Sequence, residues 1–149
     1  MIEEVLADLS PLAEKSGVAL LQAGEDLWIT GSDVLIYRAI FNLVENGVKY
    51  NRPGGSVCVA ASRRGEEAVI EVRDTGCGIP EAFRESVFQP FFRVDKSRSR
   101  EKGGVGLGLS LVWEIAHLHG GGVRVRESGE SGTVIELTLP ILAEERKMP

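Results

Sequence analysis

Hydrophobic residues recur every three or four positions in three segments of the chain, the spacing of one face of an α-helix. In the first segment Val5 and Leu9 share such a face, and Gly17 follows as a stop signal. Ser32 or Asp33 can cap the second helix, and three consecutive glycines close the third. The pattern predicts helices over residues 2–15, 33–50 and 107–119.

Short hydrophobic runs between these helices predict β-strands bounded by turns. The first two strands flank a turn at 24–26, the next two form a hairpin around Arg64-Gly65, and the last two form a second hairpin. Residues 74–106 are rich in turn formers, with one helical turn near 83–88, and residues 141–149 are expected to form a frayed tail. The predicted strands are 18–22, 27–30, 57–62, 68–74, 123–127 and 133–139.

Hairpins in some parts of the chain and helices in others favour an α+β fold. We expect a two-layer sandwich in which a mixed, mainly antiparallel sheet packs on the helices. A doubly wound parallel sheet is disfavoured, because strand and helix do not alternate. At 149 residues the chain is most simply one domain, spanning 1–149 and large enough to bury a core.

The charge and cysteine content exclude several classes of function. The formal net charge is -5, whereas general nucleic-acid binders are normally basic. The stretch 93–102 is a local exception, with five basic residues against two acidic ones. Cys58 and Cys77 have neither metal-type nor C-x-x-C spacing, so we expect no disulfide framework or zinc site. No hydrophobic run approaches the roughly 20 residues that span a membrane.

Polar residues interrupt the second predicted helix along one face. Asn42, Glu45, Asn46 and Lys49 fall at i, i+3, i+4 and i+7. One interpretation is the solvent side of an amphipathic helix. Against it, asparagine in mid-helix is a poor helix former. Amide oxygens can instead bind a hard cation such as Mg2+, with the lysine placed for a phosphate.

A second cluster, Asp74 to Pro80, ends a predicted strand with a carboxylate followed by two glycines. A tight turn after a strand is one interpretation. The other is that glycine lets the backbone approach a ligand closely. The carboxylate then accepts a hydrogen bond from an exocyclic amine, such as that of adenine.

Two further clusters follow. Residues 88–93 hold three of the five phenylalanines. They are typical of core aromatics when taken alone, but beside the basic stretch they can anchor a segment whose Arg93 and Arg98 stabilise charge during phosphoryl transfer. Gly103 to Leu109 opens into a helix, and exposed amides at a helix N-terminus bind anions. This loop is neither a Walker A motif nor a Rossmann fingerprint, because no G-K-[ST] follows and no buried strand precedes it.

The order and spacing of the four clusters together indicate an ATP-binding protein. They strongly resemble the ATP-binding catalytic domain of bacterial sensor histidine kinases, in the superfamily shared with gyrase, the MutL repair ATPases and the heat-shock chaperone ATPases. The resemblance covers nearly the whole chain, including VFQPFFRVDKSRSREKGGVGLGLSLV and HGGGVRVRESGESGTVIELTLP. It implies the Bergerat-type ATP-binding fold.

The resemblance implies that the helix supplies the metal and phosphate contacts. Asn46 matches the magnesium ligand of the family, and Asn42 supports the ion through water. Lys49 is expected to contact phosphate, and Tyr50 to lie against the base.

The same resemblance assigns the base pocket to the second cluster. Asp74 corresponds to the aspartate that selects adenine. Gly76 and Gly78 open the pocket beside it, with Ile79 next to them.

The remaining matches belong to an ATP lid at about 93–105 and to the glycine clusters. Arg93 and Arg98 match the lid arginines that reach the γ-phosphate. Gly132 and Thr133 match the last, less direct glycine box, with Thr133 expected near the nucleotide. The residues expected to wrap the triphosphate are Gly104, Val105, Gly106, Leu107 and Gly108.

One position separates the branches of this superfamily. Hydrolytic members carry a glutamate four residues before the magnesium asparagine, where it acts as the general base on water. Here that position is Asn42, which cannot take a proton, and Glu45 does not match the hydrolytic glutamate. The resemblance therefore implies transfer of the γ-phosphate to a protein histidine with little hydrolysis, and Lys49, Arg93 and Arg98 are the expected catalytic residues.

The chain departs from the family pattern at two positions. The usual alanine after the magnesium asparagine is Gly47, which loosens the helix by up to about 1 kcal/mol. The common threonine of the last glycine cluster is Val105, so any role of its hydroxyl must fall to backbone amides.

A histidine kinase phosphorylates a histidine on a separate dimerisation domain, which this chain lacks. His117 and His119 have no acidic neighbour of the kind expected beside a phosphoacceptor, and we expect structural roles for both. The chain thus resembles the nucleotide-binding half of a two-part enzyme. The resemblance implies a monomeric fragment, nearly inactive alone, from the cytosolic part of a homodimeric sensor with or without a membrane anchor. Its implied partners are ATP and ADP, the histidine-bearing domain and a response regulator, and not nucleic acid or membrane.

Two other functions share this fold. An anti-sigma-factor serine kinase is disfavoured, because that class has a glutamate that acts as a general base where this chain has Asn42. Detection of acid-stable phosphoserine on a partner protein would reverse that ranking. A nucleotide-sensing interaction module would bind ATP without transferring phosphate, even within the full-length protein.

Overall fold

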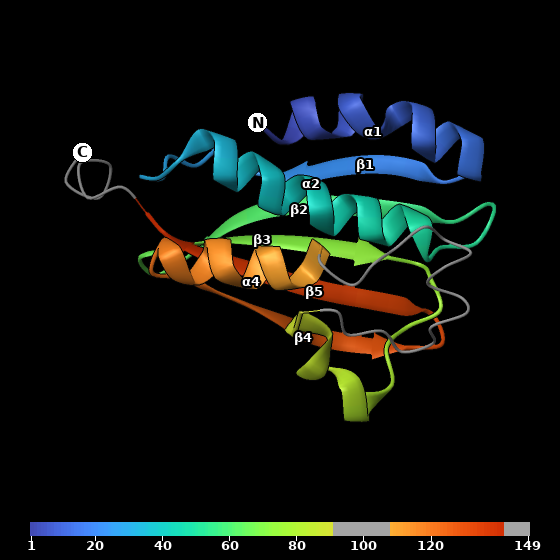
Figure 1. Ribbon diagram of the computed structural model, residues 1–149. Helices are drawn as coiled ribbons and strands as arrows, with labels where there is room; N and C mark the ends of the chain where they lie inside the picture. Colours follow the sequence, from blue (N-terminus) through green and yellow to red (C-terminus); the bar gives the residue numbers. More distant parts are fainter. Residues whose placement is uncertain (91–107, 142–149) are drawn as a thin grey trace.

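The computed structural model describes residues 1–90 and 108–141. Within these ranges, three α-helices pack on a five-stranded mixed sheet. The helices α1 (Ile2–Ser16), α2 (Asp33–Lys49) and α4 (Gly108–Leu118) cover one face of that sheet, as Figure 1 shows. The predicted α+β two-layer sandwich is confirmed.

The signals at the helix ends act as the sequence predicts. Gly17 has a left-handed φ of 70°, and its N–H bonds to the carbonyls of Ala13 and Glu14, which ends α1. The Ser32 hydroxyl accepts a hydrogen bond from the Leu35 N–H at 3.2 Å, so Ser32 is the N-cap of α2. The predicted helical turn near 83–88 forms two 3-10 turns, Glu81–Phe83 and Ser86–Phe88.

The sheet has the strand order β1-β2-β3-β5-β4. β1 runs parallel to β2, and every other neighbouring pair is antiparallel. The register places Asp74, the last residue of β3, between Val57 of β2 and Thr133 of β5. The strands are β1 (Ala19–Gly24), β2 (Ser56–Arg64), β3 (Glu67–Asp74), β4 (Gly122–Gly129) and β5 (Gly132–Pro140).

Two predictions are wrong. Residues 27–30 form no strand, and only an isolated antiparallel bridge joins Ile29 to Ile141. The turn at 24–26 therefore builds no hairpin; instead α2 is the crossover that a parallel β1–β2 pair requires. Ile141 does not belong to a frayed tail, because it is 3% exposed and its N–H bonds to the Glu66 carbonyl at 2.9 Å. Burying this side chain outweighs the fraying of a chain end. Residues 142–149 lie outside the described ranges.

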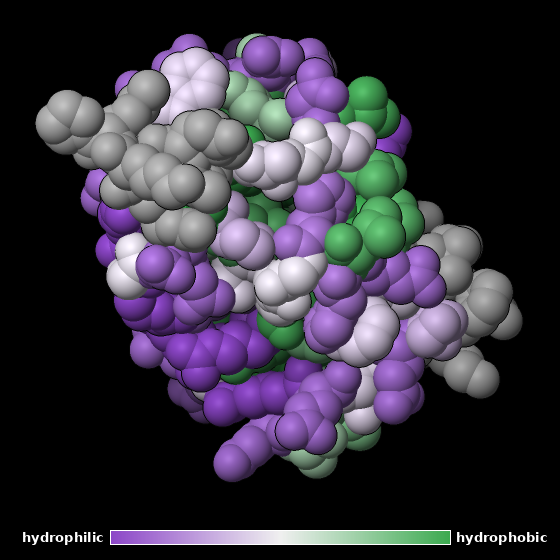
Figure 2. Space-filling model, turned by 90° about the vertical axis from the view of Figure 1, so that its left-hand side faces the viewer, coloured by the Kyte–Doolittle hydropathy of each residue, from purple (hydrophilic) through white to green (hydrophobic). Residues whose placement is uncertain are grey.

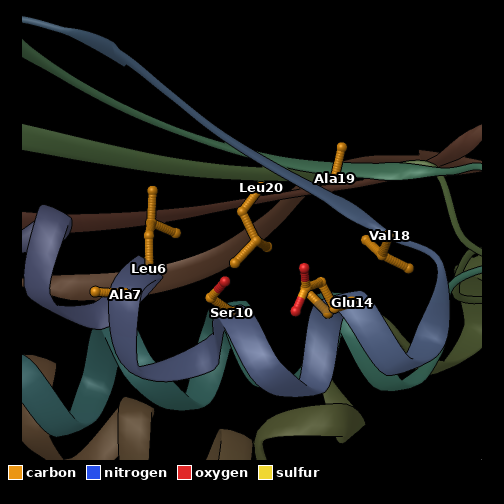
Figure 3. A pocket seen from close by; sticks show the side chains of 8 residues that line it. Leu6, Ala7, Ser10, Glu14, Val18, Ala19 and Leu20 are labelled. Atoms are coloured by element: carbon orange, nitrogen blue, oxygen red, sulfur yellow. The ribbon is translucent and has the colours of Figure 1, made fainter.

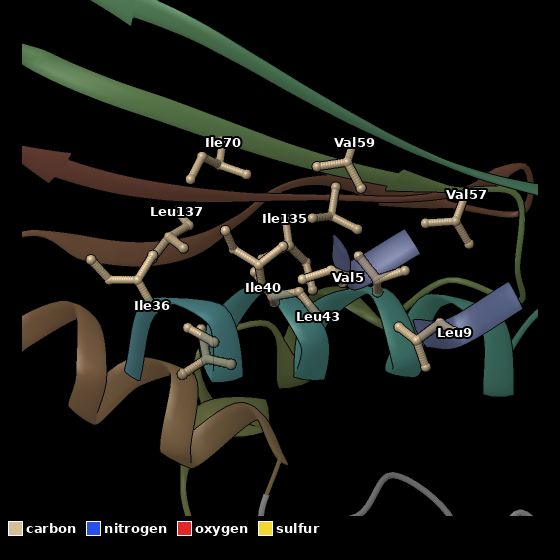
Figure 4. Packing of buried hydrophobic residues seen from close by; sticks show 14 of the residues in the cluster. Val5, Leu9, Ile36, Ile40, Leu43, Val57, Val59, Ile70, Ile135 and Leu137 are labelled. Carbon is tan, nitrogen blue, oxygen red and sulfur yellow. The ribbon is translucent and has the colours of Figure 1, made fainter. Parts of the chain in front are cut away.

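The hydrophobic core fills the space between the helices and the sheet (Figure 4). Each fully buried aliphatic side chain stabilises the fold by about 1.5–3 kcal/mol, so this contact fixes α2 against β2 and β3. The ten residues that Figure 4 labels are at most 6% exposed: Val5, Leu9, Ile36, Ile40, Leu43, Val57, Val59, Ile70, Ile135 and Leu137.

The other face of the sheet buries one carboxylate. Ile135 and Leu137 face the core, so Glu136 between them points to the opposite side, where it is 1% exposed. Arg64 Nη2 donates to Glu136 Oε1 at 2.8 Å, and Arg124 Nη2 lies 3.4 Å from the same oxygen. Burial alone would raise the pKa of Glu136, but the hydrogen bond from Arg64 and the charges of Arg124 and Arg64 hold that pKa below its ordinary value.

One face of the molecule is largely polar. The end that lies on the left of Figure 1 is mostly hydrophilic, with hydrophobic residues in separate groups between the polar ones (Figure 2). Among the helices in the described ranges, none has both the length and the hydrophobicity that crossing a bilayer requires.

We predict that Glu136→Gln lowers the free energy of unfolding at pH 7 by about 1–3 kcal/mol. The substitution removes the attraction between the buried carboxylate and the guanidinium groups of Arg64 and Arg124. Since the pKa of Glu136 is lower in the folded than in the unfolded chain, its stabilisation is present above the unfolded pKa and is lost as pH falls through the folded pKa. The difference between wild type and variant should therefore shrink in acid, as measured by urea denaturation.

Glu127→Gln is the matched control, because Glu127 pairs with Arg73 at 3.3 Å on the exposed surface. Its effect should stay within about 0.5 kcal/mol. Equal effects of the two substitutions would contradict the assignment of Glu136.

Candidate functional site

The polar face of α2 is half-buried. Asn42, Glu45, Asn46 and Lys49 all lie within the helix and keep part of their surface exposed, while Leu43, Val44 and Val48 are buried in the core. Lys49 Nζ lies 3.9 Å from Glu45 Oε1, one helical turn away. Glu45 therefore has an ion-pair partner on its own helix, and both asparagines lie on the same face as that pair.

Asn42 links α2 to the start of α4. Its Nδ2 donates to the carbonyl oxygen of Gly108 at 3.3 Å. Gly108 is the first residue of α4 and the last glycine of the predicted phosphate loop. The fold thus brings the first and fourth clusters together at this point. The other predicted residues of lid and loop lie outside the described residues: Arg93, Arg98, Gly104, Val105, Gly106 and Leu107.

The carboxylate of Asp74 is half-buried at the end of β3. Its Oδ1 accepts a hydrogen bond from the Gly76 N–H at 2.8 Å, and the backbone of Thr133 supplies another. Burial raises the pKa of Asp74 above its ordinary value, and these two backbone hydrogen bonds oppose the shift without cancelling it. The chain therefore holds at this position a carboxylate whose ionised form is poorly solvated.

The loop of residues 74–80 contacts the end of α2. The Cys77 N–H bonds to the Tyr50 carbonyl at 3.3 Å. A Cβ added to Gly76 would lie 2.3 Å from that same carbonyl oxygen, so only glycine fits there. Gly76 is therefore required by a tight turn, as one interpretation of the sequence holds. The same turn brings the Tyr50 carbonyl close to Asp74. Gly78 has a φ of 78° and lies against the Gly129 carbonyl.

The start of β5 closes over Asp74 from the other side. Gly132 has a φ of 133°, and a Cβ there would lie 1.9 Å from the Asp74 carbonyl oxygen. Thr133, which follows it, is 4% exposed and pairs with Asp74 in the sheet register. The last glycine box is therefore in contact with the second cluster.

Sequence reasoning missed Ser128 and Arg52. The Ser128 hydroxyl accepts the Ile79 N–H at 2.6 Å and lies 2.8 Å from Thr133 Oγ1. Arg52 donates to backbone carbonyls of the 74–80 loop, at 2.8 Å for Thr75 and 3.1 Å for Gly76. Nothing in the sequence pattern marks either residue, because their partners are set by strand pairing and loop contact.

Gly47 lets Asn46, the predicted magnesium ligand, lie close to Asp74, the residue predicted to bind the adenine base. A Cβ added to Gly47 would lie 3.2 Å from Val57 Cγ2 and 3.5 Å from the Asp74 Cβ. Gly47 is buried and follows Asn46 directly. Because Gly47 has no side chain, α2 lies close to the end of β3. The glycine that is expected to loosen the helix thus also brings the first two clusters closer together.

Both histidines make structural contacts. His119 Nε2 accepts the Ser32 N–H at 3.0 Å, and its Nδ1 lies 2.8 Å from the Ile115 carbonyl oxygen, so the ring joins α4 to the N-cap of α2. His117 Nδ1 lies 2.8 Å from the Trp113 carbonyl oxygen, and its ring stacks on Trp113 with centroids 3.8 Å apart.

A separate groove of about 430 Å³ lies between α1 and β1 (Figure 3). None of the predicted site residues lines it. Leu6, Val18 and Leu20 give it a partly hydrophobic lining. In the described ranges there is also no group of three or more His, Cys, Asp and Glu side chains that could hold a metal ion.

The sequence matches a known family. Residues 31–143 match the model described as "Histidine kinase-, DNA gyrase B-, and HSP90-like ATPase". The sensor-like histidine kinase SenX3 of Mycobacterium tuberculosis is 41% identical over 122 residues, which cover 82% of this chain and 30% of SenX3. The chain thus spans less than a third of that relative.

Solved structures show the same fold. The catalytic domain of histidine kinase ThkA superposes with a TM-score of 0.82 and 25% identity, covering 97% of this chain and 93% of that domain. ThkA in complex with the response regulator protein TrrA gives a TM-score of 0.78 at 25% identity, covering 97% of this chain and 40% of ThkA. Full-length ShkA in complex with AMPPNP gives 0.82 at 25% identity, covering 94% of this chain and 29% of ShkA.

We predict that His119→Ala lowers the free energy of unfolding by about 1–3 kcal/mol, because it leaves the Ser32 N–H without its acceptor. His117→Ala is the control, since His117 is exposed and interacts mainly with its own helix; its effect should be less than about 1 kcal/mol. Thermal and urea denaturation measure both. A larger effect at His117 would contradict the structural assignment of His119.

Proposed function

The chain belongs to the family of histidine kinase-, DNA gyrase B- and HSP90-like ATPases, as the catalytic domain of a two-component sensor histidine kinase, and we propose that it binds Mg-ATP between α2, the 74–80 loop and the start of α4. One observation carries this proposal. A Cβ added to Gly47, the neighbour of Asn46, would lie 3.5 Å from the Cβ of Asp74, whose carboxylate is poorly solvated.

Adenine recognition is the proposed role of Asp74. A carboxylate accepts hydrogen bonds and cannot donate when ionised, so it favours an exocyclic amine over a carbonyl at the same place. Gly76 and Gly78 keep the backbone beside it free of side chains, with Ile79 next to them and Tyr50 against the base. Thr133 supports the carboxylate through its backbone N–H.

The α2 face fits magnesium and phosphate in its donor chemistry. Neutral amide oxygens of Asn46, and of Asn42 through water, are hard ligands of the type that Mg2+ takes together with phosphate oxygens. A bound Mg2+ would neutralise part of the negative charge of the phosphates. Lys49, which Glu45 holds at 3.9 Å on the same face, is placed for a phosphate. Gly104 to Gly108, with Arg93 and Arg98 of the lid, complete the proposed contacts to the triphosphate.

The proposed reaction is phosphoryl transfer to a histidine of a separate dimerisation domain. The bond from the γ-phosphorus to the bridging oxygen breaks, a bond from phosphorus to a ring nitrogen forms, and ADP leaves. Asn42 cannot act as a base on water, and Glu45 already pairs with Lys49, which supports transfer over hydrolysis. Since His117 and His119 make structural contacts, the acceptor belongs to another domain, and the chain alone should be nearly inactive.

The proposed partners follow from the same assignment. Within a homodimeric parent the domain would meet the histidine-bearing domain and a response regulator. For ThkA, a complex with the response regulator protein TrrA has been solved. ShkA is solved with AMPPNP, which supports ATP as the nucleotide here. We place the domain in the cytoplasm, where ATP and response regulators are found.

We predict that Asp74→Asn weakens ADP binding by roughly 10- to 100-fold without destabilising the ligand-free chain, because a charge-assisted hydrogen bond contributes about 1.5–3 kcal/mol. Its pKa is raised by folding, so the stability that Asp74 contributes is complete below the unfolded pKa and is lost as pH rises through the folded pKa. At pH 7 the ionised group is therefore a net cost, and asparagine should leave the free energy of unfolding equal or higher.

Calorimetry and urea denaturation measure the two effects, with the exposed Asp26→Asn as the control. Unchanged ADP affinity in Asp74→Asn would refute the assignment.

The kinase function is tested by mixing the chain, Mg-ATP and the dimerisation domain of the same parent. We expect acid-labile phosphohistidine that requires all three components, disappears with a chelator, and is lost in Asn46→Ala because the metal ligand is gone. The chain alone should yield almost none. Acid-stable phosphoserine, or tight ATP binding with no transfer at all, would overturn the kinase assignment.

A further inference from the structure

Arg52 joins three segments of the chain through backbone carbonyls. Its Nε donates to the Thr75 oxygen at 2.8 Å, and its Nη2 donates to the oxygens of Gly76 at 3.1 Å and Glu130 at 2.9 Å. Thr75 and Gly76 lie in the 74–80 loop, and Glu130 lies in the turn between β4 and β5. Arg52 itself follows the end of α2, three residues after Lys49.

The carbonyls of Thr75 and Gly76 lie beyond the end of the β-ladder, and Gly76 is buried. The paired register of β3 with its two neighbours ends at Asp74, so the next two residues leave the β-ladder. Unpaired backbone carbonyls cost free energy when they lose water. A guanidinium offers several N–H groups in one rigid plane, and an ammonium group on a flexible stem does not. The site therefore suits arginine in a way that lysine does not reproduce.

We infer that Arg52 is a positioning residue for adenine recognition. It holds the backbone of residues 75 and 76, and the N–H of Gly76 is a hydrogen-bond donor to the Asp74 carboxylate. Arg52 thereby fixes the backbone that orients the Asp74 carboxylate, and it acts on bound adenine only through that carboxylate. This inference rests on the proposed function of Asp74.

A second set of hydrogen bonds keeps the loop attached without Arg52. Thr75 Oγ1 donates to Asn51 Oδ1 at 2.9 Å and accepts the Ser56 N–H at 2.9 Å. The Cys77 N–H bonds to the Tyr50 carbonyl. Loss of the guanidinium should therefore loosen the loop locally and leave the fold intact, because the core and the strand pairing do not involve it.

The experiment compares Arg52→Ala and Arg52→Lys with wild type, using ADP and GDP as probes in calorimetry. Both variants should lose about ten-fold in ADP affinity, while the weaker GDP affinity stays the same, so the preference for adenine falls by the same factor. Arg63→Ala is the matched control, because Arg63 donates to the Gly65 carbonyl in its own turn at 3.1 Å. It should bind both nucleotides like wild type. Melting temperatures of all three variants should stay close to that of wild type.

Amide hydrogen exchange gives a readout that needs no nucleotide. The Gly76 and Cys77 amides should exchange faster in the ligand-free Arg52 variants, with the core strands unchanged. Wild-type ADP affinity in Arg52→Ala, or equal losses for ADP and GDP, would overturn the inference. So would full retention of the preference in Arg52→Lys. If Asp74→Asn leaves ADP binding unchanged, the proposed function of Asp74 and with it the inference about adenine fail, whereas faster exchange at Gly76 would still establish that Arg52 holds the loop.

Discussion

The structure depends most on how closely the backbone surrounds Asp74. A Cβ at Gly132 would lie 1.9 Å from the Asp74 carbonyl oxygen, and one at Gly76, whose N–H bonds to Asp74 Oδ1, would lie 2.3 Å from the Tyr50 carbonyl oxygen. These separations are too short for any side chain, so two loops and the end of β3 meet through main-chain atoms. This contact removes water from the carboxylate and leaves two backbone N–H groups as its partners. A binding group is thus positioned at a cost in solvation, which is common at functional sites.

The core explains why the α2 residues lie beside that carboxylate. Ile40, Leu43 and Val44 bury one side of α2 against the sheet, so its opposite, polar side is left for Asn42, Asn46 and Lys49. The parallel β1–β2 pair uses α2 as its crossover, which lays the helix along the sheet with its C-terminal end near the end of β3. The hydrophobic contacts that stabilise the fold therefore also bring Asn42 and Asn46, the proposed metal ligands, close to Asp74, the proposed adenine-binding residue.

The sequence predicted local structure well because the signals are local. Gly17, Ser32 and the hairpin at Arg64-Gly65 act through neighbours a few residues away. The roles of the site residues stay predictions from family motifs. The sequence could not predict partners fixed by tertiary contact. Residues 27–30 have the pattern of a strand, but only Ile29 pairs, in an isolated bridge with Ile141 that buries the latter. Arg52 and Ser128 make their hydrogen bonds only because distant loops lie side by side. The parallel pairing of β1 was missed for the same reason.

Folding desolvates the Asp74 carboxylate, and we propose that an adenine amine replaces the hydrogen bond to water that is lost. The most direct test is to follow the Asp74 carboxyl carbon by NMR during a pH titration, with and without ADP. We expect a pKa above the ordinary aspartate value in the free chain, and a lower pKa when ADP is bound, because a donated hydrogen bond favours the ionised form. An ordinary pKa in the free chain, or one that ADP does not move, would contradict this proposal.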